Sequence, residues 1–409
     1  MHANTATRLP STFRRLAWSN LAAQSAEQIG LAATPIVAVV ALGAGTGETG
    51  ILQTAQTLPF VLFAIPAGML ADRMSRRSVM ASAEALRVVS LIAILALAAF
   101  NLLTWPMLAA LGFVGACGTV AYSVAAPSLV PSLVAPSALA AANARIELAR
   151  TVAFAAGPAL AGALIGWIGG TPAFGFAAAL SACAVVLLSG VHEPPRPAQP
   201  ARHPIQDVRD GARFMFHHPL LRPIFVTQFV FNTALFILQA VYVPYAVRWL
   251  GLSAFAVGVT LATYGVGMVV GALVADRVIR RLPFGIVIAI GPIAGFIASV
   301  VMVLTIWAPS SVLAGLSFFL LGVGPILWVI STTTLRQTVT PRDLLGRVSA
   351  LNILAYGARP IGAAIGAAVG GFYGAKTCLV VASAGFLIQA AVILASPVVR
   401  MARQPDIVG

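Results

Sequence analysis

Four charged residues lie inside stretches of sequence that are otherwise strongly apolar. They are Glu27, Glu84, Arg87 and Arg359. A charge in a hydrocarbon environment is costly unless it faces protein or water, so each is a candidate for binding or proton transfer. Glu84 and Arg87 are three residues apart and can pair on one helix face. We expect a structural ion pair near the cytoplasmic end of its helix, with a direct part in proton coupling as the alternative.

Glu27 and Arg359 are predicted to reach similar depths, about 15 and 18 Å into their helices at 1.5 Å per residue. This depth makes them candidate partners. If a bound molecule displaced Arg359 from Glu27, the carboxylate would be free to take up a proton. The alternative for Glu27 is a structural hydrogen bond between helices.

Polar stripes accompany these charges. Asn20, Gln24, Glu27 and Thr34 fall on one face of the first apolar stretch, with Gln28 beside them, and the seventh stretch repeats the pattern. Such stripes predict a shared aqueous cavity, although amides that only join helices are the alternative. Aromatic residues would either line the cavity or pack in the core. The remaining candidates for the cavity wall are Gln228, Asn232, Gln239, Tyr242, Tyr264, Trp328, Asn352 and Tyr356.

Long apolar helices must position these residues. The chain has 409 residues, of which 59% are hydrophobic and only 9% charged, too few to cover soluble cores. A membrane-crossing helix needs about 20 mostly apolar residues. Twelve stretches meet this requirement, at residues 17–42, 49–71, 78–100, 102–126, 140–168, 171–191, 221–249, 254–275, 283–307, 310–335, 349–372 and 376–399.

One long polar interval, residues 192–220, divides the twelve stretches into two groups of six. Its first half is a proline-rich linker. Its second half, Ile205 to His218, is typical of an amphipathic helix at the membrane surface, with Val208, Ala212 and Met215 on one side. We therefore predict an N-terminal six-helix bundle (1–191), a cytoplasmic linker with an amphipathic helix (192–220) and a C-terminal six-helix bundle (221–409).

The positive charge indicates orientation. The net charge is +14, and with twelve spans nearly all the arginines fall in segments on one side of the membrane. Only Arg248 and Lys376 are predicted at the opposite face. Because cytoplasmic loops are enriched in basic residues, both termini are expected in the cytoplasm. The charge therefore does not indicate a nucleic-acid partner. The first 16 residues are polar and basic, so no cleavable signal peptide is expected.

The two halves are related by an internal repeat. A shift of 204 residues places Asp72-Arg73 on Asp276-Arg277, and Gln24 on Gln228. A duplicated unit with an even number of spans gives parallel repeats related by an axis along the membrane normal. The predicted fold is therefore an all-α membrane protein of twelve transmembrane helices in two parallel six-helix repeats. This plan is typical of secondary transporters, with a site between the halves.

The segment between the second and third stretches reads Gly68-Met69-Leu70-Ala71-Asp72-Arg73-Met74-Ser75-Arg76-Arg77. It resembles the loop 2–3 signature of the major facilitator superfamily, with Ser75 in place of a glycine. Residues 127–162 and 335–362 resemble its bacterial branch of enterobactin exporters and macrolide-efflux proteins. The resemblance implies a major facilitator fold and a cytoplasmic latch between the halves. The implied gate residues are Gly68, Asp72, Arg73, Arg76, Arg77, Asp276, Arg277, Gly346 and Arg347.

The fifth apolar stretch, residues 140–168, contains a second motif that resembles a known one. Gly157-Pro158 followed by Gly162 is similar to a degenerate form of the motif of exporters that work as antiporters. Pro158 is expected to kink the helix, and the glycines to admit a neighbouring helix. Packing alone is the alternative. The fourth apolar stretch, residues 102–126, lacks the arginine that proton-coupled drug antiporters usually carry there. Proton coupling through such an arginine is therefore not expected.

The leading hypothesis is a secondary transporter of the bacterial inner membrane. We expect it to act as a monomer and to export small amphipathic molecules of drug or siderophore type by alternating access and proton antiport. The alternative within transport is a proton-coupled importer of a small anionic or polar metabolite, which would use Arg359. A membrane-embedded enzyme is disfavoured because the sequence has no HExxH, suitable GxSxG or Walker motif. No cofactor or metal is expected, since His217-His218 is interpreted as a surface pair.

Overall fold

The computed structural model describes residues 10–135, 138–194, 204–341, 344, 348 and 355–405, which are almost entirely helical. The first group of helices is α1 (Ser11–Val40), α2 (Thr46–Arg73), α3 (Arg76–Ala99), α4 (Trp105–Leu133), α5 (Leu139–Ile168) and α6 (Gly170–Ser189). The rest comprises α7 (Pro204–His217), α8 (Leu221–Arg248), α9 (Ala254–Arg281), α10 (Phe284–Leu304), α11 (Ser311–Val339) and α13 (Ala358–Leu394), with 3-10 turns at Ala355–Gly357 and Pro397–Arg400.

The helices account for the predicted spans. Among the described residues, 10 helices are long and apolar enough to cross a membrane. The last of these, Ala355–Leu394, is interrupted at Gly374, whose φ of 81° breaks the helix, so it supplies two spans. The more polar α1 is 30 residues long and packs against α5 and α6. This arrangement confirms the predicted all-α fold with twelve transmembrane helices.

Large apolar side chains cover the outside of the bundle. Leu273 and Val312 are each 76% exposed, and Phe372 is 85% exposed. A helix satisfies its own backbone hydrogen bonds, so such a surface is stable against lipid tails. In water it would be an aggregation site.

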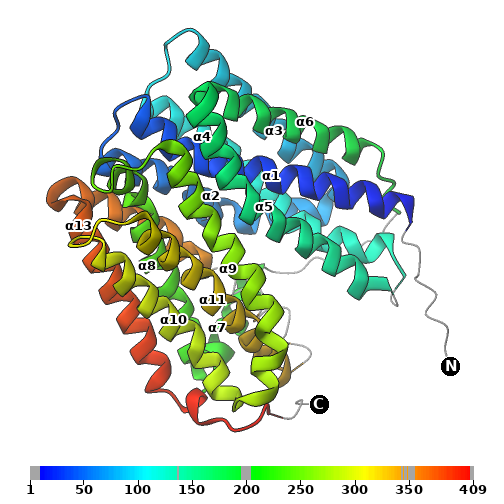
Figure 1. Ribbon diagram of the computed structural model, residues 1–409. Helices are drawn as coiled ribbons and strands as arrows, with labels where there is room; N and C mark the ends of the chain where they lie inside the picture. The colour runs from blue at the N-terminus through cyan, green and yellow to red at the C-terminus, as the bar shows by residue number, and fades with distance from the viewer. Residues whose placement is uncertain are drawn as a thin grey trace.

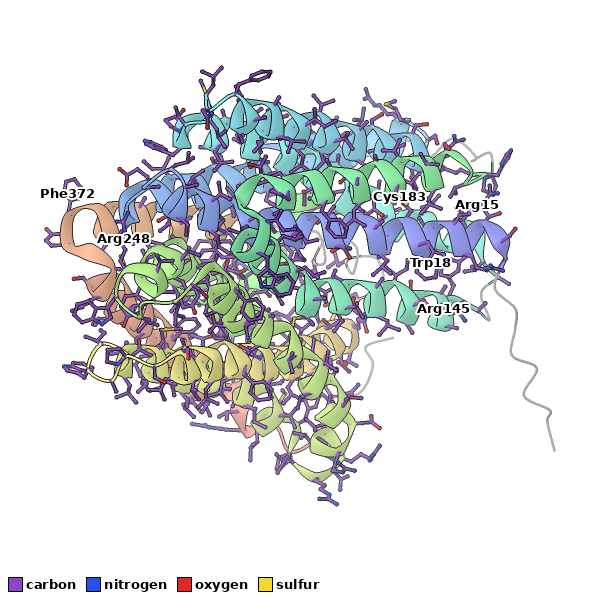
Figure 2. The ribbon with its side chains drawn as sticks, turned by 45° about the horizontal axis from the view of Figure 1, so that its top comes forward. Arg15, Trp18, Arg145, Cys183, Arg248 and Phe372 are labelled. Atoms are coloured by element: carbon purple, nitrogen blue, oxygen red, sulfur yellow. The ribbon has the colours of Figure 1, made fainter. Side chains whose placement is uncertain are left out.

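The helices form two groups that are inclined to each other (Figure 1). They meet at the end that holds the turns at 41–45 and 249–253 and the break at Gly374, which we call the hairpin end. We call the opposite end, where α1 begins and α10 begins, the linker end. Figure 2 shows Arg248 and Phe372 at the hairpin end and Arg15 and Arg145 at the linker end.

The two groups touch backbone to backbone near the hairpin end. There α5 packs against α9, and α2 packs against α13. A Cβ atom at Gly162 would lie 2.6 Å from the carbonyl oxygen of Ala254 and 2.9 Å from the Cα of Gly258. At Gly50 it would lie 2.4 Å from the Cα of Ala367. Only glycine at these positions permits so close an approach between helices.

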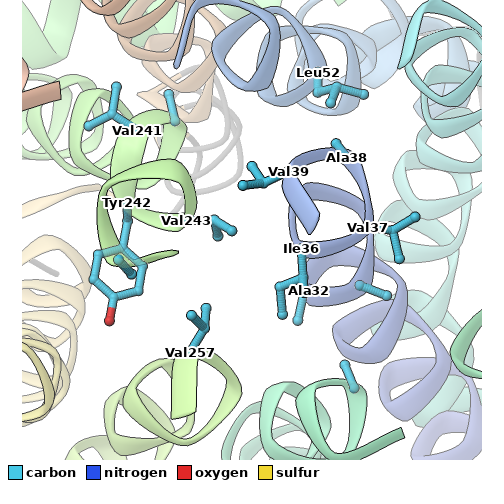
Figure 3. Packing of buried hydrophobic residues seen from close by; sticks show 14 of the residues in the cluster. Ala32, Ile36, Val37, Ala38, Val39, Leu52, Val241, Tyr242, Val243 and Val257 are labelled. Atoms are coloured by element: carbon cyan, nitrogen blue, oxygen red, sulfur yellow. The ribbon is translucent and has the colours of Figure 1, made fainter. Parts of the chain in front are cut away.

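Apolar side chains fill the space beside these contacts. Ile36 and Val39 of α1 point toward Val243 of α8 and Val257 of α9 in one buried cluster (Figure 3). A layer of this kind excludes water and contributes about 25 cal/mol per Å² of buried apolar surface.

Arg248 adds a polar contact between the groups at the same end. Its Nη2 donates hydrogen bonds to the carbonyl oxygens of Gly43 and Ala44, at 3.0 and 2.7 Å. Arg248 ends α8, whereas Gly43 and Ala44 lie in the turn after α1. The hairpin end is therefore held by glycine packing, an apolar layer and a cross-group arginine.

Two elements differ from their predicted ends. The fourth helix was expected to stop at residue 126, but α4 continues through Pro127 and Pro131 to Leu133. Similarly, α9 continues to Arg281, so the second copy of the motif at Asp276-Arg277 lies within a helix and not in a loop.

The linker helix α7 packs against the second group of helices. Ala212 and Met215 lie in a cluster with residues of α8, α10 and α11, so this part of its apolar face covers protein. After α7, Nδ1 of His218 accepts a hydrogen bond from the backbone N–H of Leu220 at 3.2 Å, and partial burial lowers the pKa of His218. His218 is therefore neutral at pH 7.

Replacing Gly162 by alanine is expected to destabilise the protein by about 1–3 kcal/mol, because the new Cβ overlaps the α9 backbone. Gly166→Ala is the matched control on the same helix. Its Cβ would lie 3.5 Å from Phe255, an ordinary contact, so it should be neutral or stabilising by about 0.5–1 kcal/mol. Thermal unfolding in an uncharged detergent measures both changes. Equal midpoints for the two variants would contradict the role of the glycine contact.

Candidate functional site

A cavity of about 450 Å³ lies between the two groups of helices. Its volume is within the range of small-molecule sites, about 300–1,000 Å³. Both groups contribute to its wall, which includes residues of α1 to α5 and of α8 to α11 and α13. Its position between two parallel repeats is the one in which transporters of this plan hold their cargo.

Most of the predicted polar and aromatic candidates line this cavity. Gln24 does not, and Asn352 lies outside the described residues. Asn20, which was placed on the same stripe, contacts other helices: its Nδ2 donates to the carbonyl oxygen of Ile146, and its Oδ1 accepts from the Tyr122 hydroxyl, both at 3.4 Å. The predicted residues in the wall are Glu27, Gln28, Thr34, Arg87, Gln228, Asn232, Gln239, Tyr242, Tyr264, Trp328, Tyr356 and Arg359.

Arg87 is the centre of a buried charge network. Its Nη1 contacts Glu84 Oε1 at 2.5 Å, and its Nη2 donates to the Thr119 hydroxyl at 2.7 Å. Nη1 also donates to the carbonyl oxygen of Ala23 at 3.3 Å, and Nη2 lies 3.8 Å from Glu27 Oε2. The predicted Glu84–Arg87 pair is therefore present, but Arg87 faces the cavity and is not confined to a helix end.

Glu27 and Arg359 do not lie within ion-pair distance in this structure, so their predicted pairing stays a hypothesis. The arginine within ion-pair distance of Glu27 is Arg87, and among the described residues no carboxylate lies within 4.0 Å of Arg359. The reason is geometric. Similar depths place both residues in the cavity wall, but they lie on different groups of helices. The Glu27 side chain is 19% exposed, and its ion-pair partner among the described residues is Arg87, at the long distance of 3.8 Å.

Aromatic rings surround Arg359 at the start of α13. Its Cζ lies 4.1 Å from the ring centre of Tyr356, 5.4 Å from that of Phe236 and 5.6 Å from that of Phe60. Guanidinium groups at these distances are attracted to ring faces. The Nε of Arg359 donates a long hydrogen bond to Asn232 Oδ1 at 3.4 Å.

Two further arginines in the wall were not predicted from the sequence. Arg150 and Arg336 were counted with the cytoplasmic charges, but both line the cavity. Arg150 pairs with Glu147 at 2.5 Å, whereas Arg336 has a buried Nε with no hydrogen-bond partner among the described residues. A usable signal existed for Arg150, which is about 15 Å into the predicted stretch 140–168 at 1.5 Å per residue, as deep as Glu27 in the predicted stretch 17–42.

The described gate residues make contacts within each group. The Arg76 guanidinium donates to the carbonyl oxygen of Ser128. Glu193 Oε2 accepts from the Ser75 hydroxyl at 2.7 Å and from the Arg77 backbone N–H at 3.0 Å, a cap on α3 that sequence reasoning did not predict. Asp276 pairs with Arg280 on its own helix at 2.5 Å. Of the other gate residues, Gly68 lies within α2, and the side chains of Arg73 and Arg277 are exposed. The structure does not describe Gly346, Arg347 or the Asp72 side chain.

The helix 5 residues bring α5 against two neighbours. A Cβ at Gly157 would lie 2.5 Å from the Cβ of Gln28 on α1, while Gly162 meets α9 as described above. Pro158, between them, lines the cavity. α5 is a continuous helix through Pro158.

This fold, with a cavity between two six-helix repeats, is that of a membrane transporter. The chain belongs to the Major Facilitator Superfamily, whose sequence model matches residues 16–367. The family and its relatives are transporters and not enzymes, which confirms transport over the enzymatic alternative.

Curated relatives include exporters. The enterobactin exporter EntS of Citrobacter koseri is 28% identical over 317 residues, which cover 75% of this chain and 72% of the relative. The enterobactin exporter EntS of Salmonella choleraesuis is 27% identical over the same length.

Solved structures share the fold. The nucleoside transporter NupG has a TM-score of 0.76 at 14% identity, over 94% of this chain and 99% of that chain. A bacterial homologue of the iron transporter ferroportin in an inward-facing state has a TM-score of 0.74 at 17% identity, over 94% of this chain and 98% of that chain.

Replacing Arg87 by alanine is expected to lower the free energy of unfolding by about 3–5 kcal/mol, because the fully buried Glu84 loses its countercharge. The double variant with Glu84→Ala should recover part of this loss, since no buried charge remains unpaired there. Arg280→Ala is the control: it breaks an exposed pair of the same length and should have little effect. Denaturation in detergent measures all three. Similar losses for Arg87→Ala and Arg280→Ala would refute this account.

Proposed function

We propose that the protein is a secondary exporter of small amphipathic molecules that works by alternating access and proton antiport in the bacterial inner membrane. The observation that carries the proposal is the Glu27 carboxylate, which faces the cavity beside an arginine already bound to Glu84 and Thr119. The similarity to enterobactin exporters supports the outward direction.

The contacts at the hairpin end support an alternating-access cycle. Glycine packing, an apolar layer and Arg248 close the cavity there. In the proposed cycle these contacts separate as the two groups rock, while contacts between the gate residues form at the linker end. Rigid rocking of one repeat against the other exposes the same cavity to the two sides in turn.

Glu27 is the proposed proton carrier. It takes up a proton when the cavity faces the outside and releases it when the cavity faces the cytoplasm. Arg87 supports both states. It lies 3.8 Å from the charged carboxylate and keeps its closer contact with Glu84 when Glu27 is protonated.

A proton-coupled anion importer is the second candidate. It is favoured by Arg336 and Arg359, which have no carboxylate partner among the described residues. An anion would bind more tightly when Glu27 is protonated, because the repulsion between the two negative charges is removed. Proton and cargo would then move in the same direction, whereas an exporter exchanges them.

We further propose that both termini and the linker lie in the cytoplasm and that the monomer is the working unit. Green fluorescent protein fused to the C-terminus is expected to fluoresce, and alkaline phosphatase fused there to be inactive. The opposite pair of activities should appear for fusions in the turn at 249–253. An active phosphatase at the C-terminus would reverse the orientation.

Glu27→Gln is expected to abolish proton-dependent transport, because the amide cannot carry a proton. Cells with and without the protein would be compared for accumulation of a panel of labelled compounds, in the presence and absence of a proton uncoupler. For an exporter, the wild type lowers accumulation and the uncoupler restores it. For an importer, both signs reverse.

The matched control is Glu48→Gln, which removes a carboxylate outside the cavity wall and should transport as the wild type does. Undiminished transport by Glu27→Gln that still depends on the proton gradient would rule out Glu27 as the carrier.

A further inference from the structure

The charges of the cavity wall are divided unequally between the two groups of helices. In the first group, Arg87 and Arg150 each have a carboxylate within 2.5 Å, Glu84 and Glu147 respectively. In the second group, Arg336 and Arg359 have none among the described residues. The wall of the second group therefore carries two positive charges with no described carboxylate within 4.0 Å.

The guanidinium of Arg359 is held so that its free edge remains available. The rings of Tyr356, Phe236 and Phe60 surround it, and Nε is occupied by Asn232. Neither terminal nitrogen has a hydrogen-bond partner among the described residues. A fork of two parallel N–H donors matches a planar anion such as a carboxylate, which it binds in a bidentate manner.

Arg336 lies on the same side of the cavity. Arg336, Tyr356 and Arg359 all line this cavity. The buried Nε of Arg336 has no partner among the described residues, an arrangement that is costly unless a ligand or water satisfies it. Arg336 therefore adds a second positive charge to the wall of the cavity that Arg359 lines.

The rings define the rest of the ligand. A small inorganic anion would contact the guanidinium groups alone, whereas the side chains of Phe60, Tyr264 and Tyr356 also line the cavity. An aromatic ring attached to the anionic group would pack among them, with ring centres 4.5–7 Å apart as aromatic pairs prefer. The subsite therefore suits a molecule that carries both groups.

We propose that Arg359 and Arg336 form an anion-binding subsite in the cavity, and that the transported molecule is an aromatic compound with a carboxylate or similar planar anionic group. The inference rests on the proposed function only in taking the cavity as the cargo site. It holds for export and for import, because binding does not depend on direction.

Direct binding to the purified full-length protein in an uncharged detergent tests the proposal. The probes share one ring system: 2-naphthoate is anionic, 2-naphthamide is neutral and 2-naphthylmethylammonium is cationic. Isothermal calorimetry at pH 7 should give naphthoate a Kd at least about tenfold below that of naphthamide, equivalent to 1.4 kcal/mol. The cation should bind more weakly than either.

Arg359→Gln should remove most of this preference while naphthamide still binds, and retained naphthamide binding shows that the variant is folded. Arg359→Lys keeps the charge but not the fork of donors, so it should lose an intermediate amount. Arg336→Gln should weaken naphthoate binding in part. Arg222→Gln is the control, because this exposed arginine lies outside the cavity wall.

Three results would overturn the proposal: equal affinity of the wild type for naphthoate and naphthamide, no naphthoate binding at all, or a preference that survives the combined Arg336→Gln and Arg359→Gln variant. The proposed function fails separately. If Glu27→Gln keeps proton-dependent transport while the anion preference is intact, the coupling proposal is wrong and the subsite stands.

Discussion

The guanidinium of Arg87 is the interaction on which the interior of the first six helices depends. It joins α3 to α4 through Thr119 and to α1 through Ala23 and Glu27, while its charge is balanced by Glu84. A membrane interior has no water to stabilise such a charge, so the helices that supply its partners must stay together. Because a charge is costly in contact with lipid, Glu27 lies in the cavity wall and the outer surface carries apolar side chains.

The two ends of the protein differ in the contacts that the two groups of helices make there. At the hairpin end, Gly50, Gly162 and Gly258 bring backbones of the two groups into direct contact. Dispersion forces are strong at such short range and weaken quickly when the surfaces part. At the linker end, the described gate residues bind within their own groups. Among the described residues, this division leaves the cavity between a packed end and one with fewer contacts between the groups.

Periodicity predicted much of the cavity wall. The stripe Gln228, Asn232, Gln239 and Tyr242 lines the cavity because α8 turns one face toward it along most of its length. The stripe on α1 was predicted less well. Asn20 and Gln24 share a face with Glu27, but Asn20 bonds α4 and α5, since α1 is buried among several helices and its polar face serves packing as well as the cavity. Arg150 and Arg336 were missed because basic residues near helix ends are usually counted as topology signals.

The family was indicated by resemblance to known motifs, whereas the sequence by itself determined the class of protein, the number of spans and the repeat. These properties follow from local composition and spacing, which a single helix or loop carries independently of its neighbours. Only the tertiary structure decided which charges meet. Glu27 faces Arg87 and not Arg359, and Arg359 lies among rings from α2 and α8. Arg248 at the end of α8 binds Ala44 in the turn after α1, 204 residues away in the sequence. Pairing in a bundle depends on which helix faces are adjacent, and depth along a helix does not specify adjacency.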